Sequence, residues 1–149
     1  MDVEGVEGFE LGCDGPSVVV VGVDGSDGSW RALHYAVGLA RRQRSTVLAV
    51  FAVTVALAPD GTPLGQGGWE AEAAPGLRDE VAELAREYGV STEFVCCSGE
   101  PVLVLAALAA ERRADAVVVG ASRAFGRRLF GSKAVRAVRR VTCPITVVP

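Results

Sequence analysis

Residues that hold metal ions or form disulfides are scarce in this sequence. Among 149 residues there are one histidine and four cysteines. No two cysteines are spaced as Cys-x-x-Cys, and the adjacent Cys96 and Cys97 would point to opposite faces of a strand. We therefore expect no zinc site and four reduced thiols, most of them filling the core of a cytoplasmic protein.

A long hydrophobic run is also missing. The longest stretch, residues 47–58, is interrupted by Thr54 and is far shorter than the roughly 20 residues that span a bilayer. The first residues are acidic, whereas a secretory signal begins with basic residues. These absences predict a cytoplasmic protein with no membrane partner. Residues 1–16 are interpreted as a loose acidic tail, and residues 17–149 as one domain.

Acidic residues are absent from the end of the chain. All 18 acids precede Ala121, and the segment from Ala121 to Pro149 carries seven bases: Arg123, Arg127, Arg128, Lys133, Arg136, Arg139 and Arg140. A net charge of −3 gives no general reason to expect nucleic-acid binding, and the segment has only two aromatic residues for base stacking. Arg136, Arg139 and Arg140 suit a solvated helix face. The arginines at 123, 127 and 128, which lie among glycines, indicate a local anion site.

Short β-branched runs alternate with stretches of helical spacing along the chain. Strands are predicted at residues 18–21, 46–54, 92–97, 116–119 and 145–148. Helices are predicted at residues 30–44, 77–88, 101–113 and 132–140. Residues 59–76 contain five glycines and three prolines and are predicted to form a long loop. This order predicts an α/β fold, a doubly wound five-stranded parallel sheet with helices on both faces.

In such a sheet, ligands bind at the carboxyl ends of strands where the winding direction reverses. Asp24, which follows the first strand, can accept hydrogen bonds from ribose hydroxyls or an adenine amine. Gly120 ends the fourth strand and opens the basic loop, which closes at Gly131 and Ser132 where a helix is predicted. Free N–H groups at a helix start favour phosphate, and Gly131 permits its close approach. These two strand ends are the predicted site.

Two better-known phosphate motifs are approached but not matched. Residues 126–133 have the length of a P-loop, but Ser132 precedes Lys133, which is the reverse of the P-loop order. The dinucleotide fingerprint G-x-G-x-x-G is absent after the first strand. The sequence therefore favours neither a P-loop nor an NAD site.

The chain resembles the universal stress protein family from about Ser17 to Pro149. The resemblance rests on five segments in order, which are VVGVDGS at 20–26, GEP at 99–101, VVVGAS at 117–122, GS at 131–132 and CPITVV at 143–148. It implies a Rossmann-like, adenine-nucleotide-binding fold, a cytoplasmic location and frequent homodimerisation. One branch of the family binds ATP through a motif G-x-x-G, nine residues, then G-[ST]. Here Arg123 takes the place of the second glycine, and the loop is two residues shorter.

The resemblance implies ATP or another adenine nucleotide as the ligand, and it leaves open whether Mg²⁺ accompanies it. By matching position, the first strand's end meets the ribose or base, and Ala52 lies by the adenine. The candidate nucleotide-binding residues are Val23, Asp24, Ala52, Gly120, Arg123, Gly131, Ser132 and Lys133.

Two functions follow from this reading. The first is a stress-response or regulatory module that binds an adenine nucleotide without catalysis. The alternative is a nucleotide-free dimeric scaffold with a degenerate phosphate loop. An enzyme is not expected, although slow ATP hydrolysis stays open, because no carboxylate or histidine follows Gly120. A homodimer is expected to form through residues 145–148, a short uncharged strand that the resemblance places at the sheet edge.

Overall fold

A computed structural model describes residues 17–53, 58–62, 68–121 and 138–149, with side chains from residue 73 onward in the third range. Its core is one five-stranded parallel sheet in the order β3-β2-β1-β4-β5. The strands are β1 (Val18–Gly22), β2 (Thr46–Val53), β3 (Thr92–Ser98), β4 (Ala116–Gly120) and β5 (Ile145–Val148). Chain order runs outward from β1 in both directions, so the doubly wound topology is confirmed.

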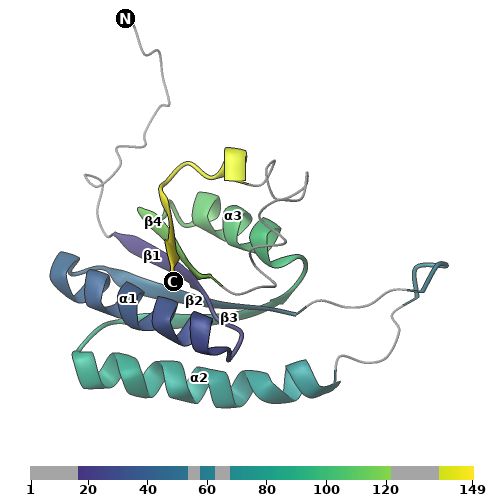
Figure 1. Ribbon diagram of the computed structural model, residues 1–149, viewed down its shortest axis with the longest axis horizontal. Helices are drawn as coiled ribbons and strands as arrows, with labels where there is room; N and C mark the ends of the chain where they lie inside the picture. Colours follow the sequence, from purple (N-terminus) through teal and green to yellow (C-terminus); the bar gives the residue numbers. More distant parts are fainter. Residues whose placement is uncertain (1–16, 54–57, 63–67, 122–137) are drawn as a thin grey trace, which may run out of the picture.

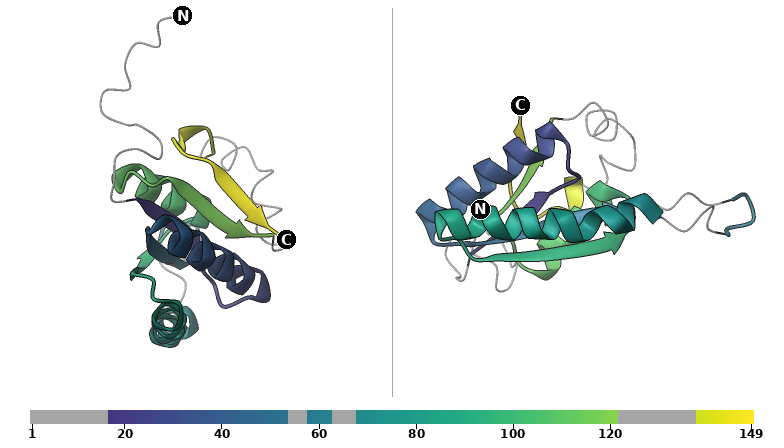
Figure 2. Two further views of the ribbon diagram at one scale, coloured as in Figure 1. Left: turned by 90° about the vertical axis from the view of Figure 1, so that its left-hand side faces the viewer. Right: turned by 90° about the horizontal axis from the view of Figure 1, so that it is seen from below.

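Helices cover both faces of this sheet, as predicted. Helices α1 (Asp27–Gln43) and α2 (Gly68–Tyr88) pack on one face and α3 (Pro101–Glu111) on the other (Figures 1 and 2). The β1 side chains divide between these two layers because neighbours in a strand point to opposite faces. Val19 and Val21 join the core under α1 and α2, whereas Val20 joins the core under α3.

The ends of the helices follow the sequence signals. Ser26 caps α1 by accepting a hydrogen bond from Ser29 N at 3.2 Å. Glu100 caps α3, and Pro101 takes its first position, where no backbone N–H is needed. Gly89 follows α2 with a positive φ of 66°. These residues set the positions at which α1 and α3 begin and α2 ends.

The predicted loop at residues 59–76 is wrong in its second half, because α2 already begins at Gly68 and contains Pro75. The sequence from Glu70 to Ala74 contains only glutamate and alanine, which favour helix. Ala74 is buried in the core beside Leu77, while Pro75 lies on the exposed side of the helix. Burial of one face therefore outweighs the cost of a proline inside the helix.

The cysteines do not fill the core as expected. Cys96 is exposed, and Cys97 and Cys143 are half-buried, all three as free thiols. Cys13 lies outside the described residues. Burial raises the pKa of the Cys97 and Cys143 thiols, which keeps both in the less reactive protonated form.

Two further predictions fall partly or wholly outside the described residues. The helix predicted at 132–140 is described only from Val138, and the predicted tail at 1–16 lies outside the described residues. Across the part of the chain that the structure describes, no helix is long and apolar enough to cross a membrane.

Candidate functional site

The ends of β1 and β2 bring three predicted site residues to one edge of the sheet. Gly22, the last residue of β1, is paired with Val50 of β2. Val23 continues beyond the strand and donates its N–H to the Val50 carbonyl at 2.9 Å. Asp24 follows Gly22 by two residues, and Ala52 follows Val50 by two residues. The two therefore lie level with each other at this edge.

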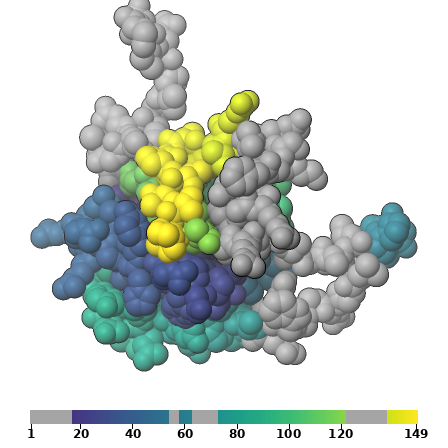
Figure 3. Space-filling view, in the orientation of Figure 1, coloured from purple at the N-terminus to yellow at the C-terminus, as the bar shows by residue number. Residues whose placement is uncertain are grey.

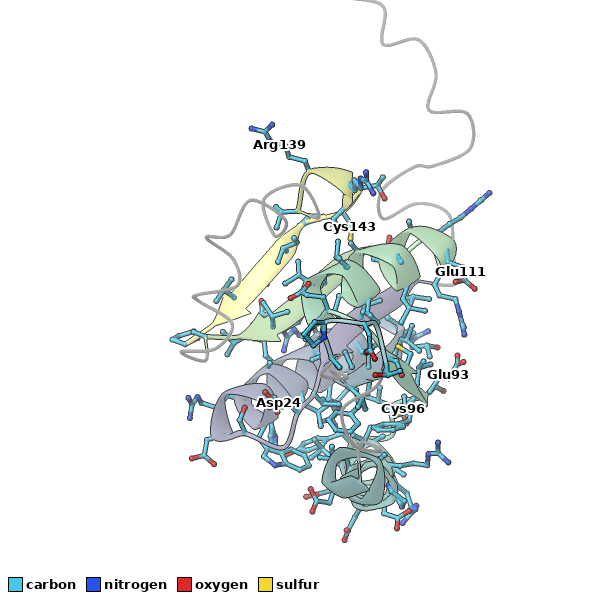
Figure 4. The ribbon with its side chains drawn as sticks, turned by 90° about the vertical axis from the view of Figure 1, so that its right-hand side faces the viewer. Asp24, Glu93, Cys96, Glu111, Arg139 and Cys143 are labelled. Atoms are coloured by element: carbon cyan, nitrogen blue, oxygen red, sulfur yellow. The ribbon has the colours of Figure 1, made fainter. Side chains whose placement is uncertain are left out.

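Asp24 sits in a tight turn between β1 and α1. Its Oδ1 accepts a hydrogen bond from Ser26 N at 2.8 Å, and its own N–H donates to Ser29 Oγ at 3.2 Å. Gly25, between Asp24 and Ser26, has a φ of 82°, a conformation that favours glycine. Ser29 Oγ also donates to the Ser26 carbonyl at 3.1 Å. One hydroxyl thus joins both ends of the turn, and Figure 4 shows Asp24 beside the start of α1.

The charge of Asp24 is stabilised by this turn. Partial burial acts to raise the pKa of the Asp24 carboxyl, but hydrogen bonds from Ser26, Ser29 and the Asp24 backbone outweigh it, and the pKa lies below its ordinary value. Asp24 remains exposed at the sheet edge. The site therefore offers a fixed, ionised acceptor for hydroxyl or amine donors.

Gly120 is at the same edge on the other side of β1. Val21 pairs with Val118 of β4, which brings Gly120 level with Val23. A Cβ at Gly120 would lie only 2.3 Å from the carbonyl oxygen of Gly28, in the first turn of α1. Gly120 is therefore required by the packing of β4 against the start of α1. This requirement is separate from the nucleotide-binding role that the family resemblance implies for Gly120.

The remaining predicted residues divide into two groups. The Val23 side chain is 6% exposed and packs in the core under α1 and α2, so only its backbone can meet a ligand. The Ala52 side chain is small and half-buried. Arg123, Gly131, Ser132 and Lys133 lie outside the described residues. No group of three acidic, histidine or cysteine side chains in the described ranges is placed to hold a metal ion.

Sequence reasoning missed the supporting roles of Gly28 and Ser29. The buried hydroxyl of Ser29 holds the Asp24 turn. Gly28 allows the close approach of Gly120. A signal was present, because Asp-Gly-Ser occurs twice in succession at residues 24–29. The first copy forms the turn, and the second forms the first helical turn.

Comparison with known families places this architecture. The family model of the universal stress protein family matches residues 17–149 of this chain. The chain belongs to this family. A universal stress protein of Methanocaldococcus jannaschii is 30% identical over 138 residues, which cover 87% of this chain and 80% of the relative.

Solved structures of universal stress proteins share the fold. One, a universal stress protein in complex with cAMP, is 31% identical with a TM-score of 0.66, and the match covers 89% of this chain and 97% of that one. The universal stress protein of Archaeoglobus fulgidus in complex with dAMP has a TM-score of 0.66 at 23% identity, with 89% and 98% covered. The second likeness bears on the fold alone.

Proposed function

We propose that this universal stress protein binds an adenine nucleotide, without catalysis, at the carboxyl ends of β1 and β4. The observation that carries the proposal is the Asp24 turn. It is a rigid, ionised acceptor at the point where β1 is flanked by β2 on one side and β4 on the other. Open α/β sheets bind ligands at this reversal of winding. The cytoplasmic location expected from the sequence stays a prediction.

The ligand class is supported by the relative crystallised with cAMP, which is 31% identical to this chain. That ligand carries an adenine base and one phosphate. In this chain, Asp24 would accept hydrogen bonds from the ribose or the adenine amine, and Ala52 would leave space for the base. Gly120, Arg123, Gly131, Ser132 and Lys133 are the residues we assign to the phosphate end. Any Mg²⁺ would be held there mainly by phosphate oxygens.

The absence of catalysis is part of the proposal. Two described acids near this edge, Asp24 and Glu100, already accept hydrogen bonds from backbone N–H groups. Asp24 is held by Ser26 N, and Glu100 is already engaged in capping α3, where it accepts from Leu103 N at 3.1 Å. Neither is placed as a general base with a supporting partner. Phosphate release from ATP should therefore be absent, or much slower than about one per second.

The test is calorimetric titration and thermal melting of the full chain with cAMP, AMP, ADP and ATP. A nucleotide at about 100 times its dissociation constant should stabilise the fold by about 2.7 kcal/mol. Asp24→Ala should remove most of this shift, and Asp60→Ala should keep it, because Asp60 makes the same local turn elsewhere. Gly131→Val tests the phosphate end. No heat and no melting shift with any of the four nucleotides would contradict the proposal.

The alternative, a nucleotide-free scaffold, is favoured by Arg123 and the shortened loop. This scaffold and the nucleotide-binding protein would have the same oligomeric state. We infer a homodimer through β5 in both cases. β5 is an edge strand, Val147 is 45% exposed, and the strand lies open at the surface in Figure 3. A two-fold pairing would satisfy both edges. Light scattering should give a dimer for the parent and a monomer for Val147→Lys, whereas a monomeric parent would overturn the assembly.

A further inference from the structure

Helices α1 and α2 form a basic groove on the face away from the sheet. They lie side by side with their carboxyl ends at the same end of the molecule (Figures 1 and 2). The groove between them, which we call the basic groove, is lined by His34, Val37, Gly38, Arg41, Arg42 and Tyr88. Tyr88 is 38% exposed there. The groove therefore combines cationic walls with an exposed aromatic surface.

The arginines of this groove lack acidic partners within the described part of the chain. An ion pair in that part of the chain joins Arg112 to Glu93 at 2.7 Å and lies on another surface. Arg41 and Arg42 occupy the last turn of α1, where positive charge suits the helix dipole. Arg44 adds a third charge just beyond the helix. The positive charge of Arg41 and Arg42 in the groove, with Arg44 next to it in the sequence, favours an acidic occupant.

The amino-terminal segment, residues 1–16, enters the fold beside this groove. Ser17, the first described residue, shares a hydroxyl hydrogen bond of 2.7 Å with Ser45, and its carbonyl accepts from Thr46 N at 3.0 Å. Ser45 directly follows Arg44 and donates its N–H to the Ala40 carbonyl at 2.9 Å. The segment is thus attached at the basic end of α1.

The segment has the complementary composition. It holds five of the 18 acids and none of the 15 bases of the chain, so the remainder carries a net charge of +2. The acids recur along its length as Asp2, Glu4, Glu7, Glu10 and Asp14. Its larger apolar residues include Phe9 and Leu11. Sixteen residues can reach about 50 Å when extended, whereas the groove from His34 to Arg42 runs about 12 Å along the helix.

We propose that residues 1–16 bind in the basic groove of the same chain. Their carboxylates pair with Arg41, Arg42 and Arg44, and Phe9 or Leu11 packs on Tyr88. The short tether gives a high local concentration, so contacts that are weak one by one suffice for occupancy. Among the described residues, a competing basic surface is formed by Arg139 and Arg140, two exposed arginines before β5, of which Arg139 points away from the body of the protein (Figure 4). That surface lacks both the aromatic floor and the adjoining attachment point.

The test uses the full chain with a nitroxide label at Val6→Cys, after replacing Cys13, Cys96, Cys97 and Cys143 by serine. Docking predicts that the backbone NMR signals of Gly38, Arg41 and Tyr88 lose most of their intensity. The loss should be reversed by Arg41→Glu with Arg42→Glu, and by about 1 M salt, where the Debye length falls to about 3 Å. The matched control, Arg139→Glu with Arg140→Glu, makes the same charge change and should leave the pattern intact.

Three results would overturn the proposal. One is even or weak broadening that the Arg41 and Arg42 reversal does not change. Another is broadening that only the Arg139 and Arg140 reversal removes. The last is full broadening in a mixture of labelled, isotope-free protein with unlabelled, isotope-enriched protein, because the occupant would then be the segment of a second copy.

Discussion

Two tripeptides of nearly the same sequence, Asp24-Gly25-Ser26 and Asp60-Gly61-Thr62, fold into nearly the same turn. In each, the aspartate Oδ1 accepts from the N–H two residues later, at 2.8 Å and 3.0 Å. The central glycines have φ values of 82° and 84°. Local chemistry therefore makes this turn wherever Asp-Gly-Ser or Asp-Gly-Thr is free to form it.

The surroundings of the two turns differ completely. The first is fastened by Ser29, lies against Leu77 and leads directly into α1 at the reversal of the sheet. The second is exposed and makes hydrogen bonds within residues 58–62, at a distance from the body of the protein (Figure 1). A carboxylate becomes a candidate binding group through its place in the sheet, and the turn alone does not confer that role.

The largest difference in stability is expected from Gly120→Ala, which disturbs the packing of β4 against the first turn of α1. The new Cβ would lie 2.3 Å from the Gly28 carbonyl oxygen, and the start of α1 would have to shift. Overpacking against backbone should lower the free energy of unfolding by about 3 kcal/mol. Urea unfolding measures this value, and nucleotide binding at Asp24 should weaken in parallel.

Gly76→Ala is the matched control for that substitution. Gly76 lies in α2, and a Cβ there would have nothing within 4 Å. The free energy of unfolding should rise by about 0.5–1 kcal/mol, because alanine is the better helix former. A loss at Gly76 similar to that at Gly120 would show that the contact with Gly28 is not the cause.

The fold was largely predictable from the sequence because its strands are buried on both faces. The runs of valine at residues 18–21 and 117–119 give no alternation, which is the pattern of a parallel sheet under helices on both faces. The loop predicted at residues 68–76 is instead helical because the Glu-Ala sequence, which buries Ala74, outweighs the glycines and Pro75.

The placement of Asp24 and Gly120 at one edge of the sheet was predictable from the sequence, but the contacts that support them were not. Asp24 and Gly120 could be placed because strand ends in parallel sheets meet at one edge. The close approach of Gly120 to Gly28 joins residues 92 apart in sequence, and no local pattern encodes it. The second Asp-Gly-Ser, at residues 27–29, is helical although the first is a turn. Tertiary packing decides between these outcomes for one tripeptide.

A smaller loss is expected from Ser29→Ala, which releases the first turn without moving the helix. Ser29 is 7% exposed, and its hydroxyl bonds the Asp24 N–H and the Ser26 carbonyl. Its removal leaves a backbone donor poorly satisfied, and the free energy of unfolding should fall by about 1–3 kcal/mol. Thr62→Val removes the hydroxyl that bonds the Asp60 carboxylate in the exposed turn and should leave the urea midpoint unchanged. Equal losses would mean that the hydroxyl acts only within the turn.

Gly25→Ala and Gly61→Ala compare the same backbone strain in the two settings. Both glycines have a φ near that of a left-handed turn, and neither Cβ would meet a severe clash. Gly25→Ala should cost about 1 kcal/mol, because its turn is lost only when the fold unfolds. Gly61→Ala should not change the unfolding transition, because its turn can rearrange without disturbing the core. The measurement is a pair of urea curves, and a matching shift for Gly61 would tie that turn to the core.

The smallest effect concerns pH. The pKa of both aspartates is lowered. At Asp24 the hydrogen bonds outweigh burial, which acts to raise it, and at Asp60 the Thr62 hydroxyl and N–H lower it. A carboxyl with a lowered pKa in the folded state stabilises the fold above its unfolded pKa. This contribution is lost as pH falls through the folded pKa.

Asp24→Asn should therefore flatten the loss of stability on acidification below about pH 4, the ordinary range of an aspartate. Asp60→Asn should leave the curve unchanged, because a turn that forms independently of the core has nearly the same pKa in the folded and unfolded chain. Urea midpoints measured from about pH 6 to about pH 2 cover this window. An equal flattening by both variants would show that the second turn also depends on the fold, and that the difference between the two turns is only one of degree.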